Sequence, residues 1–543
     1  MGGRPTVSQA LSWQPDSLRQ AADAWDAAAA DIHREFDVVV QGVAATHDFW
    51  AGEAANAARD RAGKVSGEAG RLKRALVAAA VAAHDGAEQI AAARDDVLEQ
   101  VAALRSLGFT VADDGTVTAP KQPPPAVLAT SGGDVALTEE VLHSGADEFT
   151  QEIVTKLDTL TVADDDAARD IDAAFGGVVS PEPTTATGLG DPTATWPTMS
   201  QDSIAAQIAA MTPEQRRYLV EQFPHQVGNT DGVPWDMRIA ANRINIEQAI
   251  LDSRGDQRRI AFYRGLLSEV ADPTGKPGRA QRKVLAFDPA RSSFIELIGD
   301  LRTAKNVAVL VPGMNTTIQD SAANTKTATR FVKKARGDLA MITYLGGPFP
   351  QGAIPGGIDD AMDTHYATDM APRLVAFSED VNRVVDGLSR DIDVTYVGHS
   401  YGGSILGTAE STGLTADRTV YVEAAGAGVG VHDVGDWHNR NPYVLRFSMT
   451  APGDWIEPLQ GLPVNPHGAD PDVMGGVIRL DTGDYDDGRR VGGVNSHSDV
   501  LNEPSDAWRN IYAVMTGAPY TVYTDPLKYL RPWLGPPWLR LTG

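Results

Sequence analysis

The segment with the clearest chemical potential is Gly398-His399-Ser400-Tyr401-Gly402. It follows the apolar run VTYV (394–397), typical of a buried strand, and precedes SILGTAE (404–410), typical of a helix. A strand that turns so sharply into a helix needs small flanking residues, and it holds the central serine strained with its hydroxyl exposed. The dipole of the following helix would stabilise a developing oxyanion. This pattern predicts that Ser400 is a nucleophile; the alternative is a glycine-rich turn without chemistry.

A serine nucleophile also needs a general base and a group that orients the base. Sites built on this kind of turn have the chain order serine, acid, histidine. Asp454, in APGDWI after the strand-like run YVLRF (443–447), takes the position of the acid. His497, in NSHSDVL before the closing helix, takes the position of the base. We therefore predict that Ser400, Asp454 and His497 form a catalytic triad.

Other histidines and acids compete for these roles. His467 follows Asp454 closely and is therefore early in the chain order, although it stays an alternative base. His399 adjoins the nucleophile and is expected to point away from it as a packing residue. The other base candidates are His432 and His438, and the competing acids, expected to be solvated or to form turns, are Asp433, Asp436, Asp470 and Asp472.

An oxyanion hole needs two backbone N–H donors. The first is expected from Tyr401, the residue after the nucleophile. The second is expected from the loop that follows the apolar run VAVLV (307–311), where Gly313 permits close backbone approach. We predict Met314 as this second donor, with Asn315 as the alternative.

No cofactor or metal is expected from the motifs. The chain has no His-Glu-x-x-His, P-loop or dinucleotide-binding fingerprint. The acidic loop at residues 481–488 resembles a calcium loop in composition, but it lacks the spacing and the terminal glutamate. With no cysteine among 543 residues, thiolate catalysis, disulfides and zinc–thiolate sites are excluded. We predict a solvated acidic turn at 481–488.

The charge and the apolar content of the chain limit the kinds of partner that it is expected to bind. The formal net charge is −25, which argues against binding to nucleic acid or anionic lipid. No run approaches the roughly 20 apolar residues that cross a bilayer, so no transmembrane segment is expected. The first residues lack the apolar core of a signal peptide. Localisation stays open between the cytoplasm and export by a route independent of a signal peptide.

The elements that must position the site begin near residue 285. Short apolar runs alternate there with helical stretches such as 367–388, which predicts a mostly parallel sheet covered by helices. The residues before Gly108 contain no proline after Pro15 and predict alanine-rich helices with a break at Phe49–Gly52. We expect four parts: an all-α hairpin (1–107), a β-hairpin, helix and Gly/Pro/Thr-rich linker (108–199), a helical part (200–285) and a catalytic α/β domain (286–543).

Residues from about 200 to 516 resemble an actinobacterial α/β-hydrolase family known as a domain of unknown function. The resemblance rests on pieces that occur in the family's order: GNTDGVPWDMRIAANRINIEQAI (228–250), VAVLVPGMNTT, VGHSYGGSILG, APGDWI, HGADP and HSDVL. It implies an α/β-hydrolase fold and the triad roles for Ser400, Asp454 and His497. The segment EAAGAG (423–428) departs from the Gly-Ser-Pro-Gly-like turn of that family, which bears on the pocket beside the nucleophile.

Residues 1–107 resemble the Trp-x-Gly helical hairpins of type VII secretion substrates, because Trp50-Ala51-Gly52 falls between two helical stretches. The family's usual export tail is absent. The resemblance implies a helical protein partner or self-association through this hairpin. An ordinary oligomerisation hairpin is the alternative.

Together these features predict a serine hydrolase of ester or related acyl bonds, fused behind a helical interaction module. Its expected substrate is a small-molecule or lipid ester. One alternative is an acyltransferase that uses the same triad. The other is a secreted or envelope-associated interaction protein whose hydrolase fold is catalytically idle. The acyl chain, the leaving group and the oligomeric state are not specified by the sequence.

Overall fold

The structure is a computed structural model. It describes residues 3–122, 124, 127–128, 134–176, 191–253, 255–352, 358–388, 390–460 and 465–524. The chain forms two compact units. The first, here the helical unit, comprises Met1–Thr185 and Glu247–Ser268; the second, here the α/β unit, comprises Ala186–Ile246 and Glu269–Gly543.

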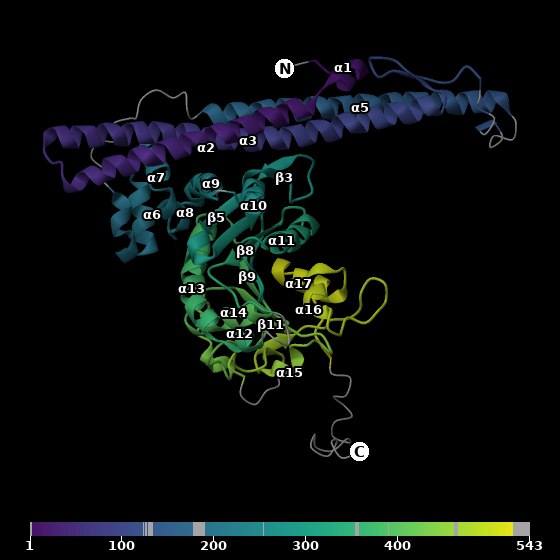
Figure 1. Cartoon of the computed structure of the whole chain (residues 1–543). Helices are drawn as coiled ribbons and strands as arrows, with labels where there is room; N and C mark the ends of the chain where they lie inside the picture. Colours follow the sequence, from purple (N-terminus) through teal and green to yellow (C-terminus); the bar gives the residue numbers. More distant parts are fainter. Residues whose placement is uncertain are drawn as a thin grey trace, which may run out of the picture. The chain divides into compact units, whose positions relative to one another are not determined.

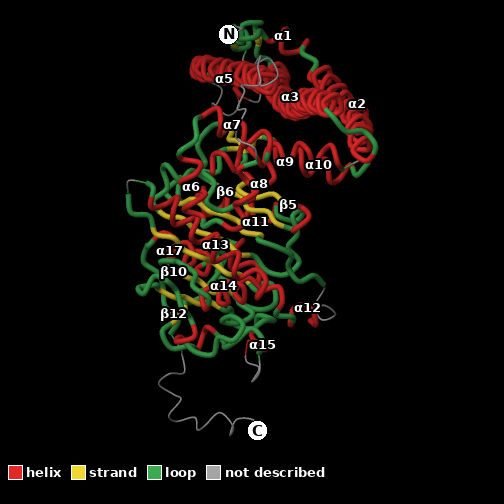
Figure 2. Tube along the Cα trace, turned by 90° about the vertical axis from the view of Figure 1, so that its left-hand side faces the viewer, coloured by secondary structure: helices red, strands yellow, loops and turns green. Residues whose placement is uncertain are grey.

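The helical unit is built on a long helix, α3 (Glu53–Ser106), with α2 (Pro15–Ala45) and α5 (Val135–Gly176) both packed against it (Figures 1 and 2). Pro15 opens α2, where its missing N–H leaves no hydrogen bond unmade. The turn between α2 and α3 contains Trp50 and Gly52, as predicted, and the φ of 109° at Gly52 favours glycine. The unit also contains α1 (Val7–Ser12), α10 (Gln257–Leu267) and the antiparallel pair β1 (Thr110–Val111) and β2 (Val117–Thr118).

Helix α5 contributes to the same core as α3. Ile153, Leu157 and Leu160 of α5 are fully buried against apolar residues of α3. The two helices approach closely, since a side-chain carbon at Gly86 would lie 2.5 Å from Ala167. The helical unit thus extends beyond residue 107, where the sequence suggested a boundary, because α3 is long enough to need a second apolar partner.

Residues 247–268 also belong to the helical unit rather than to the helical part expected at 200–285. They include the end of α9 (Trp235–Asp252) and all of α10. Arg264 of α10 forms an ion pair with Asp26 of α2. Most of the predicted Gly/Pro/Thr-rich linker, residues 177–190, lies outside the described residues.

The α/β unit contains an eight-stranded sheet in the order β12-β11-β10-β9-β7-β8-β6-β5. Pairing is parallel from β8 through β7, β9, β10 and β11 to β12, and antiparallel for β5–β6 and β6–β8. The strands are β5 (Lys283–Asp288), β6 (Ser293–Ile298), β7 (Asn306–Val311), β8 (Leu339–Leu345), β9 (Asp393–His399), β10 (Arg418–Val422), β11 (Leu445–Met449) and β12 (Val477–Arg479). A separate short pair is formed by β3 (Glu269–Ala271) and β4 (Arg279–Gln281).

Helices cover both faces of this sheet (Figure 1). One face packs against α11 (Ala322–Lys334) and α17 (Asp506–Thr516), and the other against α13 (His365–Asp386) and α14 (Tyr401–Ser411). The mostly parallel, helix-covered sheet predicted from the sequence is confirmed. The remaining helices are α6 (Gln201–Ala209), α7 (Pro213–Gln222), α8 (Pro224–Asn229), α12 (Ile358–Met362), α15 (Glu457–Gln460) and α16 (Ser496–Asn502). No helix among the described residues has the length and apolar character needed to cross a membrane.

A buried ion pair joins α9 to α13 within this unit. The guanidinium of Arg238 lies 2.9 Å from the carboxylate of Asp380, and both side chains are almost fully buried. Asp380 also accepts hydrogen bonds of 2.8 Å from the Gly232 amide and from the Trp235 indole. The segment before α9 is therefore fastened to a helix that covers the sheet.

Candidate active site

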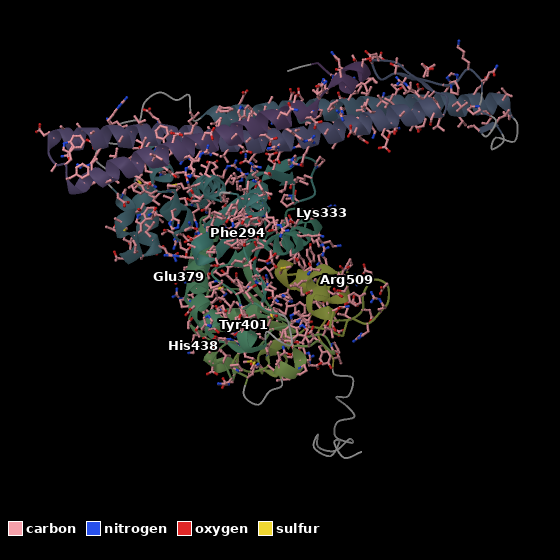
Figure 3. The ribbon with its side chains drawn as sticks, in the orientation of Figure 1. Phe294, Lys333, Glu379, Tyr401, His438 and Arg509 are labelled. Atoms are coloured by element: carbon pink, nitrogen blue, oxygen red, sulfur yellow. The ribbon has the colours of Figure 1, made fainter. Side chains whose placement is uncertain are left out.

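Ser400 lies between the end of β9 and the start of α14, with φ 56° and ψ −122°. Few non-glycine residues adopt a positive φ, and such strain is typical of functional sites. The turn leaves no room for flanking side chains, because a carbon at Gly402 would lie 2.1 Å from the Val311 carbonyl oxygen. Tyr401, labelled in Figure 3, begins α14. The local backbone has the strand–turn–helix form that the sequence predicts.

Asp454 and His497 come together from loops after different strands. Asp454 follows β11, and His497 lies in the first turn of α16, after β12. The Nδ1 of His497 lies 3.0 Å from Oδ1 of Asp454. Asp454 is buried, and its Oδ1 also accepts a 2.8 Å hydrogen bond from the Ile456 amide. The carboxylate is therefore fixed in place and orients the imidazole ring.

Ser400 and His497 line the same cleft. Within the described part of the chain, no hydrogen bond joins Ser400 Oγ to the ring of His497. Such contacts are often long in the absence of substrate and shorten in the complex. Nδ1 of His497 is engaged by Asp454, so Nε2 is the atom that a role as general base would use.

His399 supports His497 from a second direction. Its Nε2 lies 2.6 Å from the main-chain oxygen of His497, and the two rings lie 5.0 Å apart. Burial, together with the nearby His497, lowers the pKa of His399 to about 3. The ring is therefore neutral at pH 7 and donates its proton to that oxygen. This is a packing and positioning role, separate from that of the base.

The loop and turn hydrogen bonds of the described residues include none from the amide of Tyr401 or of Met314, so both stay candidate oxyanion donors. The amide of Asn315, the alternative donor, is already bonded to the Pro350 oxygen at 2.8 Å. The loop lies directly against the nucleophile, since a side-chain carbon at Gly313 would lie 2.7 Å from Ser400 Cβ. This geometry favours Met314 over Asn315.

Comparisons with known proteins agree with this architecture. Residues 288–463 match a family model described as alpha/beta hydrolase. The α/β unit has the α/β-hydrolase fold. Two curated relatives, the uncharacterized proteins MT2140 and Rv2079 from two strains of Mycobacterium tuberculosis, are each 26% identical over 271 residues, which cover 42% of this chain and 40% of each relative. This chain therefore matches less than half the length of those relatives.

Solved structures show a distant likeness to this chain. A hyperthermophilic esterase from Pyrobaculum calidifontis is 14% identical with a TM-score of 0.23, covering 56% of this chain and 97% of its own. TT1662 from Thermus thermophilus is 12% identical with a TM-score of 0.21, covering 37% and 88%. At these values the likenesses do not bear on activity. The family match and the fold together support a hydrolase.

The competing residues have other partners. The buried His467 bonds through Nδ1 with the Ser404 hydroxyl at 2.9 Å and through Nε2 with the Ala361 oxygen at 2.8 Å. Burial lowers its pKa, so the ring is neutral and structural. Asp433 and Asp436 lie in one turn, beside the exposed His432 and His438. Asp470 caps another turn, and Asp472 forms an ion pair with Arg479.

The sequence interpretation missed Glu423, which directly follows β10. It is fully buried with φ 45°, and the Ala451 amide donates to its Oε1 at 3.0 Å. Ligand atoms of Glu423, Asp454 and His497 all lie within 4.8 Å of one another. Burial, and then the charge of Asp454, raises the pKa of Glu423 to about 9, so this carboxyl is protonated at pH 7. An acidic residue at the end of the strand-like run TVYV was the available signal.

Trp455 is a second residue that sequence reasoning missed. Its ring lies 4.4 Å from that of His497. It also lines two cavities that meet at Ser400, one of about 590 Å³ and one of about 20 Å³. Trp455 therefore packs against the candidate base and helps to shape the space around the nucleophile.

Proposed function

We propose that the α/β unit is a serine hydrolase of ester or related acyl bonds. The observation that carries this proposal is the pairing of His497 with Asp454 at 3.0 Å on a cleft that Ser400 also lines. A binding module has no need of a strained serine and a histidine on one cavity, with a buried carboxylate bonded to that histidine. A catalytically idle fold is therefore the weaker alternative.

The mechanism follows from the roles of these groups. Ser400 Oγ attacks the acyl carbon while Nε2 of His497 takes its proton, and Asp454 stabilises the imidazolium. The amides of Tyr401 and Met314 bind the oxyanion. When the bond to the alcohol breaks, His497 returns the proton to the leaving oxygen, and an acyl-enzyme remains. Water activated by His497 then releases the acid and restores Ser400.

Labelling with a fluorophosphonate probe tests this proposal. We expect the probe to react with Ser400, and we expect Ser400→Ala to abolish both labelling and hydrolysis of a short-chain ester. His497→Ala should lower kcat by several orders of magnitude, as loss of a triad member does. Ser498→Ala, which removes another hydroxyl from the same cleft, should leave the label on Ser400.

His467→Ala serves as the matched control for the base. Its ring bonds to Ser404 and Ala361 and also lines the smaller cavity beside Ser400, so the substitution should lower thermal stability and reduce kcat far less than His497→Ala does. Peptide mapping that places the label on another serine would refute the nucleophile assignment. Equal losses of kcat in His467→Ala and His497→Ala would refute the choice of base. Acyl transfer to an added alcohol in preference to water would favour the acyltransferase alternative.

A further inference from the structure

Ser400 lies where two cavities meet, one lined by polar and apolar surface in about equal parts and the other lined almost wholly by apolar surface. The larger, here the polar cleft, has a volume of about 590 Å³, and the smaller, here the apolar pocket, has a volume of about 20 Å³. Ser400, Met314 and Trp455 line both. A substrate whose reacting carbon sits at Ser400 must therefore place one side in each cavity.

The position of His497, the proposed base, decides which side of the substrate occupies which cavity. Of the two cavities, His497 lines only the polar cleft, whereas Tyr401 lines only the apolar pocket. The leaving alcohol must receive its proton from His497, so its oxygen has to lie on the side of the cleft. The acyl group then lies on the other side, in the apolar pocket.

The apolar pocket restricts the acyl group. Its walls include Met362, Ile456 and Leu459, which offer no hydrogen bond. The polar side chains of Asn465 and His467 on the same lining are already bonded within the protein. A volume of about 20 Å³ holds little more than one water-sized group, since a single water occupies roughly 10–15 Å³ on this measure. The methyl group of an acetyl ester fits this space, whereas a chain of four or more carbons requires the walls to move.

The polar cleft suits a larger alcohol that carries hydroxyl groups. Its volume is in the range of small-molecule sites. Its lining includes Asn324 and the oppositely charged Lys326 and Glu503, so donors and acceptors are both present. Arg330, also on the lining, is bonded to Asn502. Hydroxyl groups both donate and accept hydrogen bonds. They therefore match this mixture of donors and acceptors better than an alkyl chain or a single charged group does.

We propose that the preferred substrate is an acetyl or propionyl ester of a bulky, hydroxyl-rich alcohol. The reaction consumes water and yields the short carboxylic acid and the free polyol, through the acyl-enzyme described above. This inference rests on the proposed serine hydrolase function and adds the substrate class.

Two substrate series on the full-length protein test the inference. In the first, kcat/KM is compared for p-nitrophenyl acetate, butyrate and octanoate; we expect acetate to exceed octanoate by about 100-fold or more, since added methylenes that do not fit a pocket cost roughly 10-fold or more. In the second, an acetylated monosaccharide is compared with octyl acetate, and the sugar ester should be preferred.

Variants of each cavity make the test specific. Leu459→Ala enlarges the apolar pocket and should raise the butyrate-to-acetate ratio about 10-fold without changing the preference between alcohols. Lys326→Ala alters the polar cleft and should weaken the preference for the sugar ester without changing the acyl ratio. An enzyme that labels at Ser400 yet prefers octanoate, or octyl acetate, would overturn this inference alone. Failure to label Ser400 would overturn the proposed function and this inference with it.

Discussion

At the scale of single residues, Glu423 has the most unusual environment near the triad. Its carboxyl is buried beside Asp454 and His497, and its pKa is raised to about 9. Between the unfolded value near 4.5 and this value, the folded protein holds a proton that the unfolded chain releases. Stability contributed by protonated Glu423 is therefore complete below about pH 4.5 and decreases as pH rises towards 9.

We expect Glu423→Gln to remove this dependence, because glutamine resembles the protonated acid and does not ionise. The difference in Tm between variant and wild type should shift in favour of the variant from pH 5 to pH 9. The corresponding slope is at most about 1.4 kcal/mol per pH unit. Glu139→Gln, which neutralises an exposed side chain on α5, is the control. Parallel Tm curves for Glu423→Gln and wild type would show that Glu423 is ionised in the folded protein.

The residues around Ser400 differ in how far sequence could predict them. The order serine, acid, histidine predicted Ser400, Asp454 and His497; in the fold Ser400 and His497 line one cleft and Asp454 bonds to His497, while their catalytic roles stay predictions. Asn315 and Met314 could not be separated, because the choice depends on the bond from Asn315 to Pro350, which joins distant loops. Glu423 was missed because its burial depends on the loop at Ala451, a long-range contact.

At the scale of elements, apolar runs predicted the central strands well. The run VAVLV lies in β7 and VTYV lies in β9, both buried between helices. The pairing of α5 with α3 was not predicted, because an apolar stripe shows that a helix needs a partner without showing which one. For the same reason, the sequence could not show that α10 belongs to the helical unit.

The ion pair between α9 and α13 gives a prediction at this scale. Asp380→Ala leaves Asp231 as the remaining carboxylate partner of the buried Arg238. It also removes the acceptor of the Gly232 amide and the Trp235 indole, so it should destabilise the α/β unit by about 3 kcal/mol. Thermal unfolding monitored by loss of hydrolysis measures the effect. Asp386→Ala, at an exposed position on the same helix, is the control and should change stability little. An unchanged melting temperature in Asp380→Ala would mean that the pair contributes little to fastening α9.

The hairpin of α2 and α3 shows the placement that its Trp-x-Gly motif suggests. Phe49 and Trp50 lie at the turn, with exposed fractions of 77% and 40%. Partner binding or self-association through this hairpin remains a proposal, as does export. The long apolar contact between α3 and α5 means that such a partner would meet a helical unit that already has its own core.

At the scale of the whole molecule, every residue assigned to the site belongs to the α/β unit. Ser400, Asp454, His497, Tyr401 and Met314 all lie in the part of this unit after Glu269. The chain nevertheless crosses to the helical unit at Glu247 and returns after Ser268. Whether the two units are independent in stability and activity is thus better tested by substitutions in the full-length protein than by truncating the chain.

Two matched cavity-forming substitutions make this test. Leu157→Ala removes a fully buried side chain from the core of the helical unit, and Ile511→Ala does so in the α/β unit. Each should cost about 2–5 kcal/mol in its own unit. Separate cores need not unfold together. Leu157→Ala should therefore lower the temperature of the first loss of helical circular dichroism signal and leave the temperature of inactivation unchanged. Ile511→Ala should lower the temperature of inactivation. If either variant shifted both temperatures equally, the two units would unfold as one cooperative body, and the helices would be a structural part of the enzyme.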